Sequence, residues 1–304
     1  MSETPDAIQP RPNFFIAGVP KAGTTSLYEY LRQHPQIFMP KYKEPNYFVS
    51  GNGIEKWEEY LELFKKAGAK KAIGESSAGY CYCEESPGWI KSALGNVKII
   101  IILRNPAARA FSLYTWMVRE GYEDAPTFAE ALEREPARLS DPLFRAQCPQ
   151  YFPDYLYFTT GLYYEQVSRY IETFGRERIK VYLSEDLINQ PLAVCQDAFR
   201  FLDVDTGFIP RMEMHNEGRF PKSIALQYWL RTALDNRQPF FARVLRKTKI
   251  VKSLMDWNVR HGRKPKLEKE LLATLSRRYQ PDIDKLQTLL GRNLSDWTNS
   301  SGSS

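Results

Sequence analysis

The chain has 304 residues, of which 43% are hydrophobic and 26% are charged, an ordinary globular composition. No apolar run approaches the roughly 20 residues that a membrane-spanning helix needs, and the polar, acidic start resembles neither a signal peptide nor a transit peptide. The four cysteines are too scattered for a disulfide framework, and the three histidines lack metal-ligand spacing. We therefore expect a reduced, metal-free protein of the cytoplasm.

The net charge of +6 is not spread evenly along the chain. Residues 207–266 carry a large excess of Lys and Arg over Asp and Glu, so the remainder is mildly acidic. Such a segment usually forms a solvated face, but it also suits contact with nucleic acid, an anionic lipid surface or an anionic cofactor. Because no nucleic-acid-binding motif accompanies it, we expect no nucleic-acid partner.

Apolar strand patterns alternate with helical patterns, which predicts a parallel sheet built from strand–helix–strand units. The expected strands are Phe14–Ala17, Lys71–Gly74, Val97–Leu103 and Ile179–Leu183. The expected helices are Thr25–Gln33, Ile54–Lys66, Pro106–Glu120, Leu162–Phe174, Leu192–Leu202 and Glu268–Tyr279. Several prolines in Arg134–Asp154 predict a long surface excursion. The fold class is therefore α/β, a doubly wound parallel sheet flanked by helices.

The expected organisation is one domain over residues 13–297, with a basic helical insertion at about 207–258. The polar segments 1–12 and 298–304 are expected to be disordered tails.

The segment between the first strand and the first helix predicts an anion-binding loop. Gly18 and Gly23 have the spacing of a Walker A loop, but Thr24 stands where that motif places its lysine, and Lys21 lies inside the loop. Backbone N–H groups can still surround an anion at the helix N-terminus. The motif has nothing for a γ-phosphate or magnesium. A donor with one 5′-phosphate and one transferable anionic group therefore suits it better than ATP.

A second polar motif follows the most apolar strand. Arg104 stands at the strand's carboxyl end, where open α/β sheets bind ligands, and Asn105-Pro106 is typical of a helix start. Ser112 lies two turns further along that helix. A guanidinium and a hydroxyl so spaced could hold a second phosphate. The plainer alternative is that Arg104 pairs with a carboxylate and Ser112 faces water.

Together these segments resemble the 5′-phosphosulfate loop and the 3′-phosphate-binding strand and helix of sulfotransferases. The family's pattern of Arg, Pro two residues on and Ser eight residues on is complete at Arg104, Pro106 and Ser112. The resemblance implies a P-loop-like sulfotransferase fold, no metal, and 3′-phosphoadenosine 5′-phosphosulfate (PAPS) as co-substrate, with adenosine 3′,5′-bisphosphate (PAP) as product. The implied donor-binding residues here are Lys21, Ala22, Gly23, Thr24, Thr25, Ser26, Arg104 and Ser112.

The segment Met39–Phe48 resembles the stretch that carries the catalytic glutamate in glycan-modifying Golgi sulfotransferases. By this resemblance Glu44 is the catalytic base and Lys21 neutralises the leaving phosphate. Many bacterial relatives have Lys-Glu-Pro-His here, whereas this chain has Asn46 in place of the histidine, which leaves Glu44 as the only candidate base in the segment. The alternative is a loop ion pair between Glu44 and its lysine neighbours.

Two further segments resemble the family. Glu75–Tyr80 resembles its Glu-Lys-Thr-Pro-Ala-Tyr segment, which implies a role in shaping the acceptor site or in capping the strand. Arg260–Pro265 resembles the Lys-Gly-Arg loop that closes over the adenosine 3′-phosphate. Gly262 and Arg263 match that loop, and His261 replaces its lysine.

Two other functions stay open on the sequence: a P-loop kinase or NTPase that uses ATP with magnesium, and a non-catalytic binding module. The acceptor of a sulfotransferase would be a hydroxyl, less readily an amine, of a glycan, lipid or small metabolite, and the oligomeric state is not indicated. Residues 224–257 mix aromatic and basic side chains. This mixture suits an acceptor lid, peripheral contact with an anionic membrane, or an amphipathic helix packed on the sheet.

Overall fold

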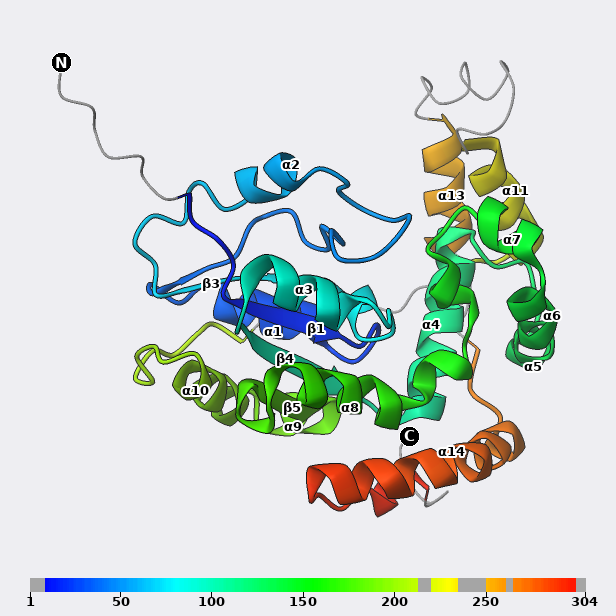
Figure 1. Ribbon diagram of the computed structural model, residues 1–304. Helices are drawn as coiled ribbons and strands as arrows, with labels where there is room; N and C mark the ends of the chain where they lie inside the picture. The colour runs from blue at the N-terminus through cyan, green and yellow to red at the C-terminus, as the bar shows by residue number, and fades with distance from the viewer. Residues whose placement is uncertain (1–8, 213–219, 235–249, 261–264, 299–304) are drawn as a thin grey trace. The chain divides into compact units, whose positions relative to one another are not determined.

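The computed structural model describes residues 9–212, 220–234, 250–260 and 265–298 (Figure 1). The chain divides into two compact units. The first contains residues 1–104 and 164–215, and the second contains residues 105–163 and 216–304. The single-domain organisation, with its tails and insertion, stays a prediction.

A five-stranded parallel sheet forms the centre of the first unit. Its strands are β1 (Phe14–Gly18), β2 (Ile37–Phe38), β3 (Ala72–Ser76), β4 (Lys98–Leu103) and β5 (Ile179–Leu183), in the order β2-β3-β1-β4-β5. Central strand β1 pairs with β3 on one side and with β4 on the other. The prediction of a doubly wound α/β sheet is confirmed.

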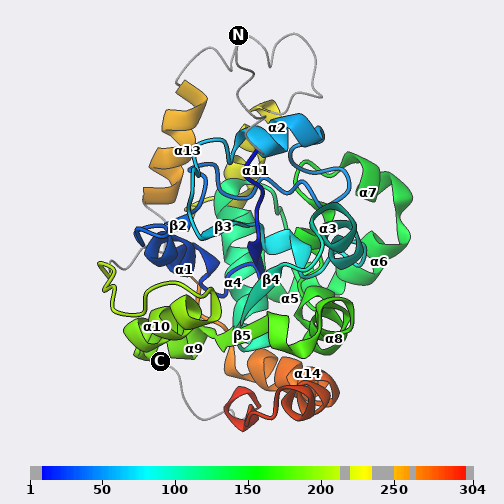
Figure 2. The same cartoon turned by 60° about the vertical axis from the view of Figure 1, so that its left-hand side comes forward.

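Helices cover both faces of this sheet, which is why β4 is a nearly continuous apolar run. Figure 2 shows α1 (Thr24–Leu31), α9 (Ser184–Asn189) and α10 (Pro191–Phe201) on one face, with α3 (Ser86–Leu94) and α8 (Tyr163–Phe174) on the other. His34, just after α1, packs against Phe199 of α10 with ring centroids 4.6 Å apart. On the opposite face, the Tyr170 hydroxyl donates to the Tyr80 carbonyl at 2.9 Å. Short helix α2 (Trp57–Glu62) and the 3₁₀ turn η1 (Ala78–Tyr80) complete this unit around the β3 end.

The second unit is helical. Within the described residues, its α-helices are α4 (Pro106–Glu120), α5 (Phe128–Glu133), α6 (Glu135–Ser140), α7 (Pro142–Gln147), α11 (Ile224–Leu234), α13 (Ile250–Arg260) and α14 (Lys269–Leu290). Helix α11 contacts the end of α4, where Gln227 Nε2 donates to the Arg119 carbonyl at 2.7 Å. Helices α11 and α13 share the apolar cluster of Leu230, Val251 and Met255.

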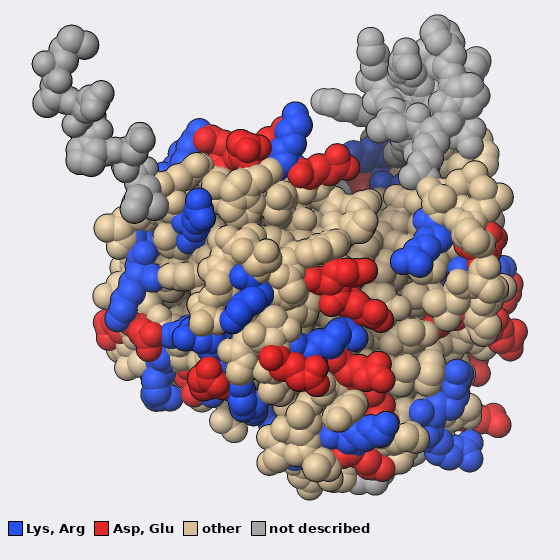
Figure 3. Space-filling model, viewed as in Figure 1, with Lys and Arg blue, Asp and Glu red and all other residues tan. Residues whose placement is uncertain are grey.

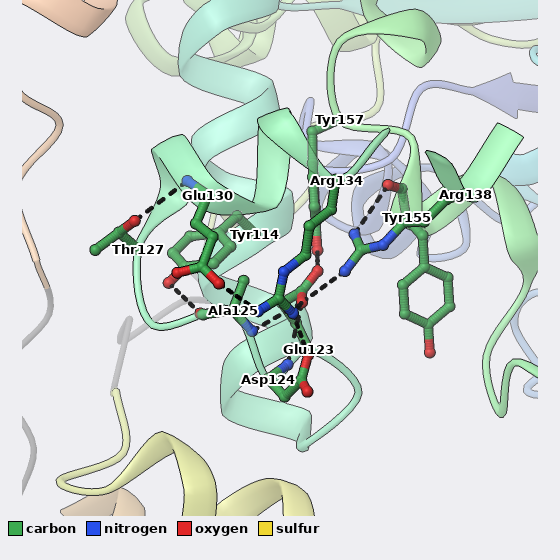
Figure 4. Close-up of polar contacts among 10 residues, drawn as sticks. All are labelled: Tyr114, Glu123, Asp124, Ala125, Thr127, Glu130, Arg134, Arg138, Tyr155 and Tyr157. Atoms are coloured by element: carbon green, nitrogen blue, oxygen red, sulfur yellow. Dashed lines mark hydrogen bonds and ion pairs between the residues drawn. The ribbon is translucent and has the colours of Figure 1, made fainter. Parts of the chain in front are cut away.

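A buried polar network organises the chain between α4 and α6 (Figure 4). The Glu123 carboxylate accepts from Arg138 Nη2 at 2.8 Å, from the Tyr157 hydroxyl at 2.7 Å and from the Ala125 amide at 2.9 Å. Burial alone would raise the pKa of Glu123, but Arg138 and the other donors outweigh it and leave that pKa lowered. The ionised pair is therefore an integral part of this core.

Two predicted elements, the helix Pro106–Glu120 and the strand Ile179–Leu183, have the bounds that the structure shows. The predicted surface excursion Arg134–Asp154 is mostly exposed, and it contains two short helices, α6 and α7, that the sequence did not indicate. Pro136 and Pro142 stand in the first turns of these helices, where a missing N–H removes no intrahelical bond. The predicted helix Glu268–Tyr279 continues through Pro281 to Leu290.

Candidate functional site

The loop between β1 and α1 lies at the carboxyl edge of the sheet, as open α/β folds place their ligand sites. The Val19 amide donates to the Ile102 carbonyl of β4 at 2.9 Å, which fixes the start of the loop. A Cβ at Gly18 would lie 2.5 Å from the Cys81 Cβ, so no side chain fits there. Burial raises the pKa of the Cys81 thiol to about 12, so this cysteine packs against the loop as a neutral thiol.

Gly23 is the N-cap of α1 and has a φ of 104°, a left-handed conformation that favours glycine. It brings no capping side chain, and no acidic residue stands in the first turn. The first-turn amides of Thr24, Thr25 and Ser26 have no intrahelical acceptor, and the positive end of the helix dipole has no local carboxylate beside it. Ala22, within the loop, is fully buried. This helix end is suited to an anion.

Arg104 links the two sequence motifs within the first unit. Its Nη1 donates to the Lys21 carbonyl oxygen at 3.0 Å. The two residues come from the ends of neighbouring parallel strands, β4 and β1. Lys21 itself has a positive φ of 69°, and its side chain is partly exposed. One guanidinium and one ammonium are thereby held at the same loop.

The structure does not test the remaining predicted phosphate ligands, because they lie in the second unit or outside the described residues. Ser112 is a half-buried residue of α4, in the second unit, and its carbonyl accepts from the Thr115 hydroxyl at 3.0 Å. Gly262 and Arg263 lie outside the described residues, as does His261. Their roles stay predictions.

Glu44 lies in the segment after β2, at the same edge of the sheet as the anion loop. Its amide donates to the Ser76 carbonyl, at the end of β3, at 3.0 Å. Because β3 and β1 are adjacent and parallel, this bond places Glu44 by the loop edge. Its side chain is 46% exposed and forms an ion pair with Lys43. The anticipated ion pair therefore exists, and the exposed carboxylate is also open to an acceptor from solvent.

Glu75 begins the segment Glu75–Tyr80 that resembles the family, but the sequence did not indicate that its carboxyl group is buried. It lies in β3 with its side chain fully buried, next to Ser76, whose carbonyl accepts from the Glu44 amide. Burial raises the pKa of Glu75 to about 7, and hydrogen bonds from Tyr80, Ser77 and Tyr60 limit that rise. The signals in the sequence were the family resemblance of Glu75–Tyr80 and the position of this glutamate in a predicted strand. The two glutamates therefore differ in exposure: the Glu75 side chain is fully buried, and the Glu44 side chain is exposed.

Among the described residues, no group of three or more His, Cys, Asp and Glu side chains could hold a metal ion. In the same ranges, no helix has both the length and the apolar character needed to cross a bilayer. Figure 3 shows acidic and basic side chains interspersed on one face of the molecule, so the positive net charge does not gather there into a single patch.

The sheet and loop define an α/β protein whose β1–α1 loop is a candidate anion site of the phosphate-loop type. The sulfotransferase domain family matches residues 11–217. A solved sulfotransferase from Alicyclobacillus acidocaldarius is 30% identical, with a TM-score of 0.72 over 95% of this chain and 99% of that one. The chain therefore belongs to the sulfotransferase family, and the predicted family and enzyme class are confirmed.

Two curated relatives show how far the sequence similarity extends. The membrane-associated sulfotransferase kil1 of Dictyostelium discoideum is 26% identical over 64% of this chain and 56% of its own length. The human heparan sulfate glucosamine 3-O-sulfotransferase 5 is 29% identical over 69% of this chain and 58% of its own length. The chain thus matches a little over half the length of these relatives.

Proposed function

We propose that this protein transfers a sulfuryl group from PAPS to an acceptor hydroxyl, less readily to an amine. The observation that carries the proposal is the 3.0 Å hydrogen bond from Arg104 to the Lys21 carbonyl. It joins a helix N-terminus suited to one phosphate with a guanidinium suited to another. A nucleotide phosphorylated at both its 3′ and 5′ positions needs such a pair of groups.

The donor is bound by two sets of groups in this proposal. Lys21 and the amides of residues 22–26 hold the 5′-phosphosulfate, since a helix N-terminus favours an anion. Arg104 binds the 3′-phosphate, with Ser112, Gly262 and Arg263 contributing as the family resemblance implies. These contacts select PAPS over ATP, and neither set requires a metal ion.

Transfer itself is an in-line displacement between oxygens, in which the protein positions the reactants and stabilises charge. An S–O bond forms between the acceptor oxygen and sulfur while the bridging bond from sulfur to the 5′-phosphate breaks. Glu44 accepts the acceptor's proton. Lys21 neutralises the charge that grows on the leaving phosphate of PAP.

The acceptor binds beside Glu44 in this proposal. The Glu44 side chain is 46% exposed, so its carboxylate is open to an acceptor from solvent. Relatives named for heparan sulfate glucosamine favour a glycan hydroxyl, ahead of a lipid or a small metabolite.

The experiment is a transfer assay with ³⁵S-labelled PAPS and a panel of glycan, lipid and small-molecule alcohols and amines. We expect label to move to a glycan acceptor, and Glu44→Gln to suppress that transfer. Label in the lipid or small-molecule products instead would reassign the acceptor class. A panel that stays unlabelled, from protein that binds PAP, would count against the enzyme and for the non-catalytic binding module.

Peripheral membrane contact is a second, separate proposal for helices α11 and α13. Trp229, Leu254 and Trp257 are 63%, 45% and 50% exposed, unusual for large apolar side chains. Basic residues surround them in the sequence, a combination typical of interfacial helices.

Co-sedimentation with anionic vesicles, but not with neutral ones, is the expected result, and Trp229→Ala with Trp257→Ala should abolish it. No co-sedimentation at low salt would remove the proposal. The cytoplasmic location stays a prediction.

A further inference from the structure

The buried carboxyl group of Glu75 is surrounded by hydroxyl groups. Ser77 Oγ donates to its Oε2 at 2.8 Å, and the Tyr60 hydroxyl donates to its Oε1 at 3.4 Å. The Tyr80 hydroxyl is a third hydrogen-bonding partner, and Lys43 is the cation that acts on it. The donors come from α2 (Tyr60), η1 (Tyr80) and the residue after β3 (Ser77), so three different segments converge on one carboxylate.

Two of these hydroxyl oxygens also hold the segment that carries Glu44. Ser77 Oγ accepts from the Asn46 amide at 3.1 Å, and the Tyr80 hydroxyl accepts from the Phe48 amide at 3.4 Å. Glu44 and Asn46 have positive φ angles of 60° and 51°, a conformation that non-glycine residues adopt at a cost. The segment therefore depends on outside contacts to keep its shape.

The donor and acceptor capacity of these groups determines which way the hydroxyl hydrogens of Ser77 and Tyr80 point. An ionised carboxylate can only accept hydrogen bonds, whereas a hydroxyl has one hydrogen to donate and two lone pairs to accept with. The hydrogens of Ser77 and Tyr80 must then point at Glu75, which leaves their lone pairs for the Asn46 and Phe48 amides. A side chain at position 75 that could itself donate a hydrogen bond would no longer fix the direction of these two hydroxyl hydrogens.

We propose that Glu75 is a positioning residue, which orients the hydroxyls of Ser77 and Tyr80 so that they clamp backbone 44–48 and hold the Glu44 carboxylate in place for transfer. The inference rests on the proposed function, because it assigns a task to the support behind the proposed base. It predicts that replacing Glu75 lowers kcat and leaves the affinity for the donor nucleotide unchanged, because the proposed donor contacts come from the ends of β1 and β4.

Matched hydroxyl deletions separate this clamp from general packing. Ser77→Ala and Tyr80→Phe each remove a hydroxyl that touches both Glu75 and a loop amide. Tyr60→Phe removes a hydroxyl that reaches the same carboxylate but no loop amide. We expect the first two variants to lower kcat by about ten- to a hundredfold, the scale of a small misplacement of a reacting group, with unchanged PAP affinity. Tyr60→Phe should stay within about twofold of wild type by the same reasoning.

A pH profile tests Glu75 itself. The clamp needs the ionised carboxylate, so wild-type kcat should rise through a limb near pH 7, the value to which burial raises the Glu75 pKa. Glu75→Gln should lower kcat and abolish that limb. If Glu75→Gln fails to fold, the Ser77→Ala and Tyr80→Phe comparison with Tyr60→Phe decides the matter.

Hydrogen exchange gives a readout that does not need activity. The amides of Asn46 and Phe48 should exchange about tenfold faster or more in Ser77→Ala and Tyr80→Phe, respectively, and unchanged in Tyr60→Phe, because each lost acceptor exposes one amide. Unchanged exchange and kcat in both variants, or equal losses in all three, would overturn the inference. A wild-type protein that binds no PAP and transfers no label would instead overturn the proposed function, and the exchange result would still stand.

Discussion

Replacing Arg104 is the sharpest perturbation of the donor site. Its half-buried guanidinium donates to the Lys21 carbonyl at 3.0 Å, and it has five N–H donors in all, enough to bind a phosphate in addition. A hydrogen bond to a charged group contributes about 1.5–3 kcal/mol. Arg104→Ala should therefore weaken PAP binding by about 10- to 150-fold.

Titration calorimetry with two nucleotides separates the two tasks of Arg104. PAP carries both phosphates, whereas AMP lacks the 3′-phosphate. If Arg104 binds the 3′-phosphate, Arg104→Ala should lose PAP affinity and keep AMP affinity almost unchanged. If it only braces the loop through Lys21, both affinities should fall together. Equal losses, or no loss at all, would refute the second phosphate site. Arg145→Ala, an exposed position in the second unit, is the control for loss of one positive charge.

Three other substitutions test the base and the two buried carboxylates. Glu44→Gln should reduce kcat by about 10²–10⁴-fold, the usual contribution of a general base, with PAP affinity retained in calorimetry; parallel losses of both would refute the assignment. Arg138→Met should destabilise the protein by about 3–5 kcal/mol in urea unfolding, because it removes the nearer cation of the buried Glu123 carboxylate and leaves the more distant Arg134 Nη1, at 3.9 Å; a loss below about 1 kcal/mol would show that the network is dispensable. Stability should fall as pH rises from about 4.5 to about 7, because the folded protein favours protonated Glu75, and Glu75→Gln should flatten this dependence; an identical slope in that variant would contradict the assignment.

Much of the local structure of the candidate donor site could be predicted from the sequence because its signals are local. The β1 strand, the glycine-bounded loop and the Asn105-Pro106 helix start each depend on a few neighbouring residues. The contact between Arg104 and Lys21 followed from one general rule, that parallel strands bring their carboxyl ends to one edge.

Other features could not be predicted, because they depend on tertiary contacts. Strand β2 has only two residues, too few for a periodic pattern, and forms by pairing with β3. The prolines of α6 and α7 indicated a surface excursion, but not that each stands in the first turn of a short helix. The burial of Glu75, and the clamp it forms with Ser77 and Tyr80, arise only when η1 and α2 close over the end of β3.

Nucleotide selectivity tests the central claim most directly. Calorimetry or thermal shift should show PAP binding to the wild-type protein without added metal, while ATP with magnesium binds far more weakly. Lys21→Ala should lose most of the PAP affinity, because the 5′-phosphate loses its cation. Tighter binding of ATP with magnesium than of PAP would instead identify a P-loop kinase or NTPase and contradict the account.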